Sequence, residues 1–548
     1  MSRKLTPDST LETFKKEAKR WLKALRAGDV QARHRILAAT PAASANPGLR
    51  DVQLALAREY DLPGWAALRQ ALDDLALDRH SHEERVEIVL RSAWGGDPVA
   101  AARILARWPE IGADNLYTAA ATGNLAEVER RLAADPAAAT RKGGPLDWEP
   151  LLYVAYARLG GDEHAIDMAR LLLDHGADPN AQFDDGWGNP FKVLTGVIGE
   201  GEGDKAPHPR AAELALLLIE RGADPYDSQT LYNTSITRDD TRWLDFLWMQ
   251  SGERDRLAEW REKLIGGSVP LKSLDYLLGN AVANDHLARA EWLLVHGANA
   301  NGVHAYSGRP LREEALINGN MALADLLVRH GAAAPPLDGQ AAFQAACMRL
   351  DRDAARAIAE RHPECLRDAS PMLIAARRGR ADIVALLLEL GMDADVADAT
   401  GQRGLHNASG NGAIEVAKLL IARGADIDRP TTKFGGPLGF AAHFQQREMA
   451  ALLAPLSRDV LELTYLAMKE RLRELFAAEP ALANAVHPKA GITPLFCLPD
   501  DEDEAVEIAA LLLAHGADPK ATNKEGLTAE QATRRRGLID AADLMSGD

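Results

Sequence analysis

Short runs of apolar residues recur along the chain, and each run ends at the same kind of turn. The runs are rich in leucine, and glycine followed by small residues and often aspartate comes directly after them. Such a run predicts the buried stripe of a helix, and the glycine predicts its end, because glycine readily adopts the left-handed conformation that closes many helices. This leucine–glycine phrase occupies Leu171–Asn180, Leu216–Tyr226, Leu293–Asn301, Leu326–Ala334, Leu386–Asp395, Leu419–Asp428 and Leu511–Lys520.

A second phrase alternates with the first and ends in proline. In it a short turn precedes an amphipathic stretch, and the proline prevents the predicted helix from continuing. The two phrases follow each other without a long interruption, so we interpret the whole chain as one repeat array rather than as a catalytic domain with appended repeats. The proline phrase occupies Arg26–Pro41, Trp94–Pro109, Ala121–Pro136, Met348–Pro363 and Met468–Pro480.

Histidine stands directly before the glycine in four of the leucine–glycine phrases. A dipolar or cationic side chain suits the negative end of a helix, which favours a structural role over metal binding. No group of residues has the spacing of a metal or nucleotide site, so neither a metal nor another cofactor is predicted. The four residues are His175, His296, His330 and His515.

A third phrase, proline or glycine followed by an apolar residue, opens the first helix of several units. Its members at positions 371, 404 and 437 are 33 residues apart, and the clearest unit is Asp398–Asp428. Together with the leucine-rich helix and the Gly-Ala-Asp turn, this pattern resembles the ankyrin repeat. The family's Thr-Pro-Leu opening survives at Thr493–Leu495, and His406 falls where the family opens its inner helix. The resemblance is strong from about 310 to 435 and looser elsewhere.

The resemblance implies an all-α, ankyrin-type helical repeat solenoid with short turns or fingers, superhelical with a concave groove. In that family each unit consists of a finger, an inner helix and an outer helix, and stacked neighbours share one core. On the order of fourteen units fit in the chain at this period. The segment Leu11–Leu77 resembles the helical leader of bacterial ankyrin proteins.

Departures from the regular pattern divide the chain into five expected parts. The irregular parts are its two ends and its centre. We expect a helical N-terminal cap or leader at 1–80, divergent ankyrin-like repeats at 81–182, irregular central repeats with insertions at 183–310, ankyrin-like repeats at 311–521 and a C-terminal capping unit at 522–548.

The charge balance excludes one class of partner. There are 80 acidic and 63 basic residues, a formal net charge of −17, and an acidic chain without a basic stripe repels nucleic-acid phosphates. Cys347, Cys365 and Cys497 are far apart, which indicates buried thiols in a reducing compartment rather than disulfides. No apolar stretch reaches the length of a membrane span or a signal peptide, so we expect a cytoplasmic protein without membrane contact.

The irregular centre is where we expect an individual function, because departures from a repeat carry function more often than the repeat itself. Two polar residues of a predicted inner helix, Tyr232 and Asn233, would face the groove and need partners there. The fingers supply aromatic and arginine side chains of the kind enriched in binding hot spots, although each could instead pack on its neighbouring finger. The candidate partner- or ligand-binding residues are Trp148, Asp185, Trp187, Tyr232, Asn233, His304, Tyr306 and Arg309.

No sequence motif of a known catalytic site is present, so no catalytic residue is predicted, although a site assembled from distant repeats would leave no local motif. The leading hypothesis is an interaction scaffold that binds a protein or peptide through its groove and fingers. The alternative is an enzyme or small-molecule sensor with a pocket in the irregular centre, and self-association is a third. A deep pocket with a perturbed titratable group would favour the enzyme, and a shallow open groove would favour the scaffold.

Overall fold

The computed structural model of the 548-residue chain describes residues 3–6, 9–41, 44, 47–184, 190–199, 206–236, 238–265, 270–431, 435–487 and 490–546. By its internal contacts the chain divides into two compact units, residues 1–280 and 281–548. The division falls within one helix, α16 (Ser273–Ala283).

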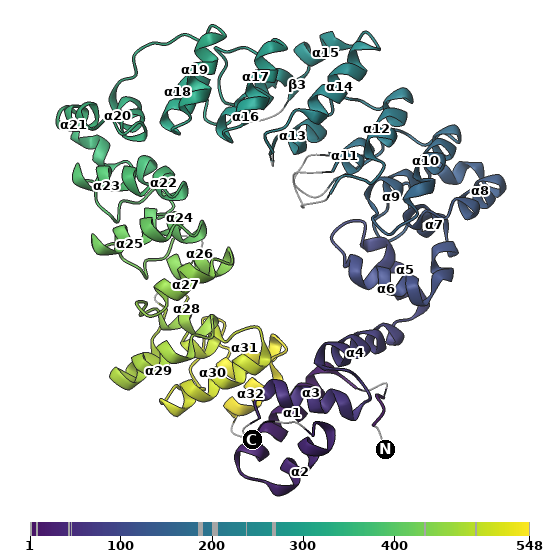
Figure 1. Cartoon of the computed structure of the whole chain (residues 1–548), viewed down its shortest axis with the longest axis vertical. Helices are drawn as coiled ribbons and strands as arrows, with labels where there is room; N and C mark the ends of the chain where they lie inside the picture. The colour runs from purple at the N-terminus through teal and green to yellow at the C-terminus, as the bar shows by residue number, and fades with distance from the viewer. Residues whose placement is uncertain are drawn as a thin grey trace. The chain divides into compact units, whose positions relative to one another are not determined.

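Short helices follow one another in packed pairs through most of the first unit (Figure 1). Inner helices α7, α9, α11 and α13 contact each other in succession, and so do outer helices α8, α10 and α12. The helices before α16 are α1 (Leu11–Arg26), α2 (Val30–Ala39), α3 (Leu49–Glu59), α4 (Trp65–Arg79), α5 (His82–Arg91), α6 (Pro98–Arg107), α7 (Leu116–Thr122), α8 (Leu125–Ala134), α9 (Pro150–Tyr156), α10 (Ala165–Asp174), α11 (Val193–Ile198), α12 (Ala211–Glu220), α13 (Ser228–Ile236), α14 (Arg242–Gly252) and α15 (Leu257–Glu262).

The second unit repeats the same arrangement. Its inner helices α18, α20, α22, α24 and α26 form one continuous row of contacts. The helices are α17 (Leu287–Val295), α18 (Leu311–Ile317), α19 (Met321–Arg329), α20 (Gly339–Met348), α21 (Arg352–Arg361), α22 (Ser370–Arg377), α23 (Ala381–Glu389), α24 (Gly404–Gly410), α25 (Ile414–Ala422), α26 (Pro437–His443), α27 (Arg447–Leu453), α28 (Val460–Tyr465), α29 (Lys469–Ala478), α30 (Glu502–Ala514), α31 (Ala529–Arg535) and α32 (Ile539–Ser546).

The two kinds of helix end follow the two sequence phrases. The glycine after each leucine run has a φ between 81° and 105°, which confirms the predicted left-handed helix ends. In four of the five proline phrases the proline begins a short 3-10 helix, so the chain turns there instead of extending the α-helix. The 3-10 helices are η1 (Pro109–Ala113), η2 (Pro136–Thr140), η3 (Asp162–His164), η4 (Pro363–Arg367), η5 (Pro480–Asn484) and η6 (Pro494–Cys497).

The histidines before the glycines have the predicted structural role in three of four cases. The Nδ1 atom of His175 lies 2.9 Å from the carbonyl oxygen of Leu171, one helical turn earlier. His296 and His515 make the same contact with the carbonyl oxygens four residues before them, at 2.7 and 2.9 Å. Each imidazole therefore closes a helix by satisfying one of its last carbonyl groups.

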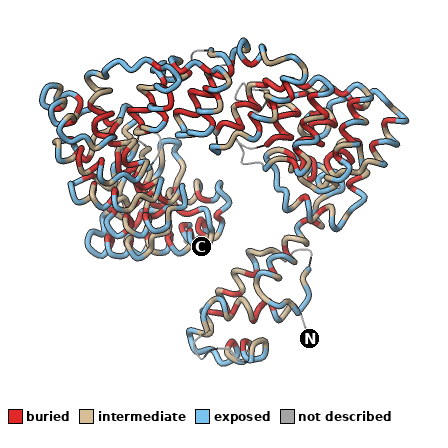
Figure 2. Tube along the Cα trace, turned by 45° about the horizontal axis from the view of Figure 1, so that its top comes forward, coloured by how far each residue is buried: buried red, intermediate tan, exposed pale blue. Residues whose placement is uncertain are grey.

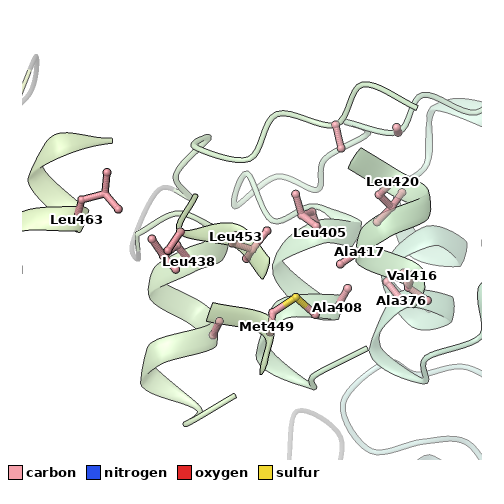
Figure 3. Close-up of a cluster of buried hydrophobic side chains, with 14 of the residues drawn as sticks. Ala376, Leu405, Ala408, Val416, Ala417, Leu420, Leu438, Met449, Leu453 and Leu463 are labelled. Atoms are coloured by element: carbon pink, nitrogen blue, oxygen red, sulfur yellow. The ribbon is translucent and has the colours of Figure 1, made fainter. Parts of the chain in front are cut away.

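Buried residues lie between the helices, and exposed residues lie on their outer surfaces (Figure 2). In the second unit one apolar core runs from Phe343 to Met545. The small side chains of Ala376 and Ala408 are fully buried, which lets successive inner helices approach closely, and Met449 extends toward Ala408 (Figure 3). Because this core is shared by neighbours, each pair of helices depends on the next for burial of its apolar face.

A recurring asparagine links one repeat to the next at the turn after the outer helix. Asn301 donates from Nδ2 to the carbonyl oxygen of Gly331 at 3.0 Å, and its Oδ1 accepts from the backbone N–H of Ala333 at 2.7 Å. Asn180 and Asn484 make the same pair of bonds with the glycine turns at 222–224 and 516–518. At the equivalent place Asp395 accepts from the N–H of Asp426 but has no N–H group with which to donate. We call this pair of bonds the asparagine link.

The predicted helical repeat array is confirmed, but two fingers are β-hairpins rather than simple turns. Strands β1 (Gln182–Asp184) and β2 (Pro190–Lys192) pair antiparallel, as do β3 (Leu264–Ile265) and β4 (Leu271–Lys272). Phe183 pairs with Phe191 across the first hairpin, and the two rings pack on Trp148 and Trp94, which precede the hairpin in the chain. None of the helices formed by the described residues is long and apolar enough to cross a bilayer.

Candidate functional site

A polar groove runs along the inner helices of the second unit. It is lined by residues of α18, α20, α22 and α24 and of the fingers that precede α18 and α24. Its volume is about 330 Å³, and it is open to solvent. We call it the inner-helix groove, and its polar lining includes Arg309, Glu314, Asn318, Gln344, Arg377 and Asn407.

The repeat pattern explains which residues line this groove. The inner helices α22 and α24 have proline or glycine followed by an apolar residue at their start, and this residue, Met372 or Leu405, is buried in the shared core. A residue two positions later lies about 200° around the helix, on the opposite face. Ile374 and Asn407 stand at that second position, and both line the groove.

Glu314 is the buried carboxylate of the groove. It is 8 % exposed, and its Oε1 accepts a hydrogen bond from Nδ2 of Asn318 at 3.0 Å. Its Oε2 accepts one from the Ser307 hydroxyl at 3.1 Å. These bonds hold the carboxylate against the finger that precedes α18, so Glu314 stabilises the groove wall.

Amide side chains join the helices across the groove floor. Gln344 donates from Nε2 to the carbonyl oxygen of Ile317 at 2.9 Å, which joins α20 to α18. Asn407 donates from Nδ2 to the carbonyl oxygen of Leu373 at 2.8 Å, which joins α24 to α22, and it accepts from Gln402. One N–H group of each of these two amides is thus directed into the protein and joins neighbouring repeats.

Two arginines stand at the edge of the groove. Arg309 has a side chain that is 52 % exposed, and its Nη1 lies 3.8 Å from Oε2 of Glu314, too far for a hydrogen bond. Arg377, in the last turn of α22, is exposed, and within the described part of the chain no carboxylate lies within 4 Å of it. The groove therefore carries two cationic groups and one anionic group in a chain whose net charge is −17.

Three of the predicted site residues come together in the finger at 303–309. The finger is closed by the pairing of Val303 with Pro310, and His304 lies 3.1 Å from the Ser307 hydroxyl through its Nδ1. Tyr306 is 54 % exposed beside the His304 ring, with the two ring centres 5.7 Å apart. Arg309 follows and contributes directly to the inner-helix groove.

Trp148, predicted as a partner- or ligand-binding residue, is buried between neighbouring fingers. It is 3 % exposed, and it stacks on Phe183 with the two ring centres 4.3 Å apart. Tyr153 and Tyr156 contact the same ring at 5.3 and 5.4 Å. The aromatic finger packs against the next finger instead of facing solvent, because burying so large a ring in the array is strongly favourable.

Asn233, another predicted site residue, is buried as well. It is 3 % exposed and accepts a hydrogen bond from Nε2 of Gln229, one turn earlier on α13, at 2.8 Å. Its polar group is satisfied inside the unit and does not face a groove. Tyr232 is half-buried on the same helix. Asp185 and Trp187 lie outside the described residues.

The sequence prediction missed most of the groove. It named Arg309 but none of Glu314, Asn318, Gln344 or Arg377, because it sought the site in the irregular centre rather than in the regular repeats that follow. A signal was available: each of the four inner helices carries at least one amide or charged residue among its otherwise apolar residues, such as Glu314, Gln344, Arg377 and Asn407. Polar groups on an otherwise apolar helix indicate a surface that is not covered by the helices of neighbouring repeats.

The described hollows do not resemble an enclosed catalytic pocket. A hollow of about 440 Å³ beside α5 and α7 is open like the inner-helix groove. A more enclosed cavity, near Asp162 and His208, has a volume of about 10 Å³, which holds one water molecule at most. Burial lowers the pKa of His208 to about 4, and its Nε2 lies 3.6 Å from Asp162. Within the described residues no cluster of three or more His, Cys, Asp or Glu is arranged to hold a metal ion.

One titratable group outside the groove has a strongly perturbed environment. Glu462, in the first turn of α28, directs its carboxylate at the glycines that begin α26, and a methyl group added at Gly439 would overlap Oε1. Its Oε2 is shut off from solvent. Burial is the main reason that the pKa of Glu462 rises to about 7, and Asp459 and Asp428 act in the same direction. The backbone N–H groups of Gly436 and Gly439 partly oppose this rise in the pKa.

Comparison with known proteins identifies the repeats of this region. Residues 360–431 match the family of ankyrin repeats in three copies. The putative ankyrin repeat protein YahD of Escherichia coli K12 is 29 % identical over 187 residues, which cover 32 % of this chain and 92 % of that protein. The probable E3 ubiquitin-protein ligase XBOS32 of Oryza sativa subsp. japonica is 33 % identical over 193 residues, 32 % of this chain. The match spans only 38 % of the rice protein's length.

Proposed function

This chain is an ankyrin-repeat protein, and we propose that it serves as an interaction scaffold that binds a protein or peptide through the inner-helix groove and the finger at 303–309. The observation that carries the proposal is the groove itself. Four successive inner helices contribute to one surface, and hydrogen bonds between neighbouring repeats fix the amides of Gln344 and Asn407 in it. A surface held in place in this way does not have to be ordered when a partner binds.

The dimensions of the groove favour an extended peptide segment. Neighbouring helices pack about 8–10 Å apart, so four inner helices span roughly 25–30 Å. An extended chain rises about 3.3 Å per residue, and the groove therefore accommodates about eight or nine residues. The half-buried side chains of Leu373 and Ile374 provide an apolar strip between the amides. Such a strip can bury part of the peptide's side chains.

The proposal is tested by panning a random dodecapeptide display library against the whole chain. We expect selected peptides to lose binding when Leu373→Trp fills the groove. Leu419→Trp is the matched control, because Leu419 is half-buried like Leu373 but lies on the outer helix α25. Circular dichroism shows whether both variants remain folded. Selection of no peptide, or only of peptides that bind Leu373→Trp as well as the unchanged protein, would refute the proposed function.

A further inference from the structure

We propose that the segment bound in the inner-helix groove carries a carboxylate side chain, which Arg309 and Arg377 bind; this inference rests on the proposed function. It names the chemical class of the partner: an extended peptide with an aspartate or glutamate.

The inner-helix groove already contains one carboxylate, that of Glu314. Both oxygens of Glu314 accept hydrogen bonds from within the protein, from Asn318 and from Ser307. Its distance of 3.8 Å to Arg309 leaves the guanidinium N–H groups without a hydrogen bond to it. An Arg side chain carries five N–H donors, and those of Arg309 remain available at the half-exposed edge of the groove.

Arg377 lines the groove and, in the part of the chain that the structure describes, also has no carboxylate partner, unlike Arg380 and Arg352. Arg380, three residues later, makes two hydrogen bonds with Asp382 at 2.9 and 2.8 Å, and Arg352 pairs with Glu389 at 2.5 Å. Among the described residues, no carboxylate takes the corresponding place beside Arg377, although the chain as a whole has an excess of acidic groups. A guanidinium that lines a groove and has no internal anion favours an anionic ligand.

The amides decide between a carboxylate on a peptide and a free phosphate. Both N–H groups of Asn318 and one N–H group of Gln344 point to protein acceptors, so carbonyl oxygens are the main amide groups left for a ligand. A peptide backbone supplies N–H donors for such oxygens, while its acidic side chain reaches the arginines. Phosphate presents mainly acceptor oxygens, which the carbonyl oxygens would repel. The donors and acceptors of the groove therefore match an acidic peptide.

The experiment uses the whole chain and peptides selected from the dodecapeptide library. We expect the selected sequences to be enriched in aspartate or glutamate. Each peptide is then synthesised again with its acidic residues changed to asparagine or glutamine, and binding is measured by fluorescence polarisation. Affinity for the unchanged protein should fall about tenfold or more, and the fall should be greater at low salt because the interaction is between charges.

A double-mutant cycle assigns the effect to the two arginines. The double variant Arg309→Gln with Arg377→Gln should bind the acidic and the amide peptides equally, since the pairwise interaction is then absent. Arg356→Gln is the control, because Arg356 is exposed on the outer helix α21 and the change in charge is the same. Arg377→Lys should retain part of the preference through its charge.

The outcomes separate the two proposals. Groove-dependent peptides without acidic residues, or an acidic preference that survives in the double variant, would overturn this inference and leave the proposed function standing. Competition by inorganic phosphate at equal or lower concentration than by acidic peptide would overturn it too, because the site would then recognise a phosphate. The absence of any groove-dependent peptide would refute the proposed function itself.

Discussion

Replacing Glu462 by glutamine should remove a pH dependence from the stability of the second unit. In the folded chain the carboxylate is enclosed by the glycines that begin α26, and burial raises its pKa from 4.5 to about 7. Folding therefore favours the neutral acid. Glutamine keeps the shape of the side chain and the carbonyl acceptor for the glycine backbone but cannot ionise.

The sign and size follow from the two pKa values. A carboxyl group whose pKa is raised by folding contributes fully to stability below its unfolded-state pKa, and that contribution is lost as the pH rises from 4.5 through 7. The change in pKa corresponds to roughly 3 kcal/mol. We therefore expect the free energy of unfolding of the unchanged protein, relative to Glu462→Gln, to fall by about this amount between pH 4 and pH 8.

Urea denaturation at several pH values, followed by circular dichroism, measures this difference, and hydrogen exchange at residues 435–465 locates it. Glu448→Gln is the control, because Glu448 is an exposed carboxylate on the adjacent helix α27. Its difference from the unchanged protein should stay nearly constant with pH. A constant difference for Glu462→Gln as well would show that the carboxylate is not enclosed as described.

Four further changes test other parts of the array by urea denaturation. Asn301→Ala removes both bonds of an asparagine link and should lower the free energy of unfolding by about 1–2 kcal/mol. Asp395→Asn adds the missing donor and should raise that free energy by up to about 1 kcal/mol. Equal effects of the two substitutions would contradict the role of the link. Trp148→Ala should cost about 3–5 kcal/mol and abolish the near-ultraviolet dichroism of the aromatic cluster, and a cost below 1 kcal/mol would place the ring at the surface after all. Gly222→Ala, at φ 100°, should cost about 1–2 kcal/mol, and no loss would refute the requirement for a left-handed residue there.

The fold could be predicted from the sequence because its determinants are local. A leucine run followed by glycine specifies a helix and its end within ten residues, and the glycine conformations agree with this at every occurrence of the phrase. The hairpin of β1 and β2 was missed because its pairing depends on Phe183 and Phe191 meeting rings from other repeats. Such contacts join residues that are far apart in the sequence.

The binding surface was less predictable because exposure is a property of neighbouring repeats. Nothing near Trp148 in the sequence shows that Phe183, 35 residues later, covers its ring. Arg309 was predicted from its finger, whereas Arg377 lies in a regular repeat and, unlike Arg380, has no aspartate two residues later. Periodicity predicts which face of a helix is apolar. Whether a charged residue on the other face has an ion-pair partner depends on the positions of the neighbouring repeats, which periodicity does not give.

The concentration of aromatic residues in the first unit also determines which part of this protein intrinsic fluorescence follows. Nine of the ten tryptophans lie in residues 1–280, and Trp292 alone lies in residues 281–548. Intrinsic fluorescence therefore follows almost exclusively the first unit, while far-ultraviolet dichroism follows the helices of both. A single denaturation experiment recorded with the two signals resolves the unfolding of each unit without labels. The unit that contains the inner-helix groove contributes little to the fluorescence, so its unfolding is followed by dichroism.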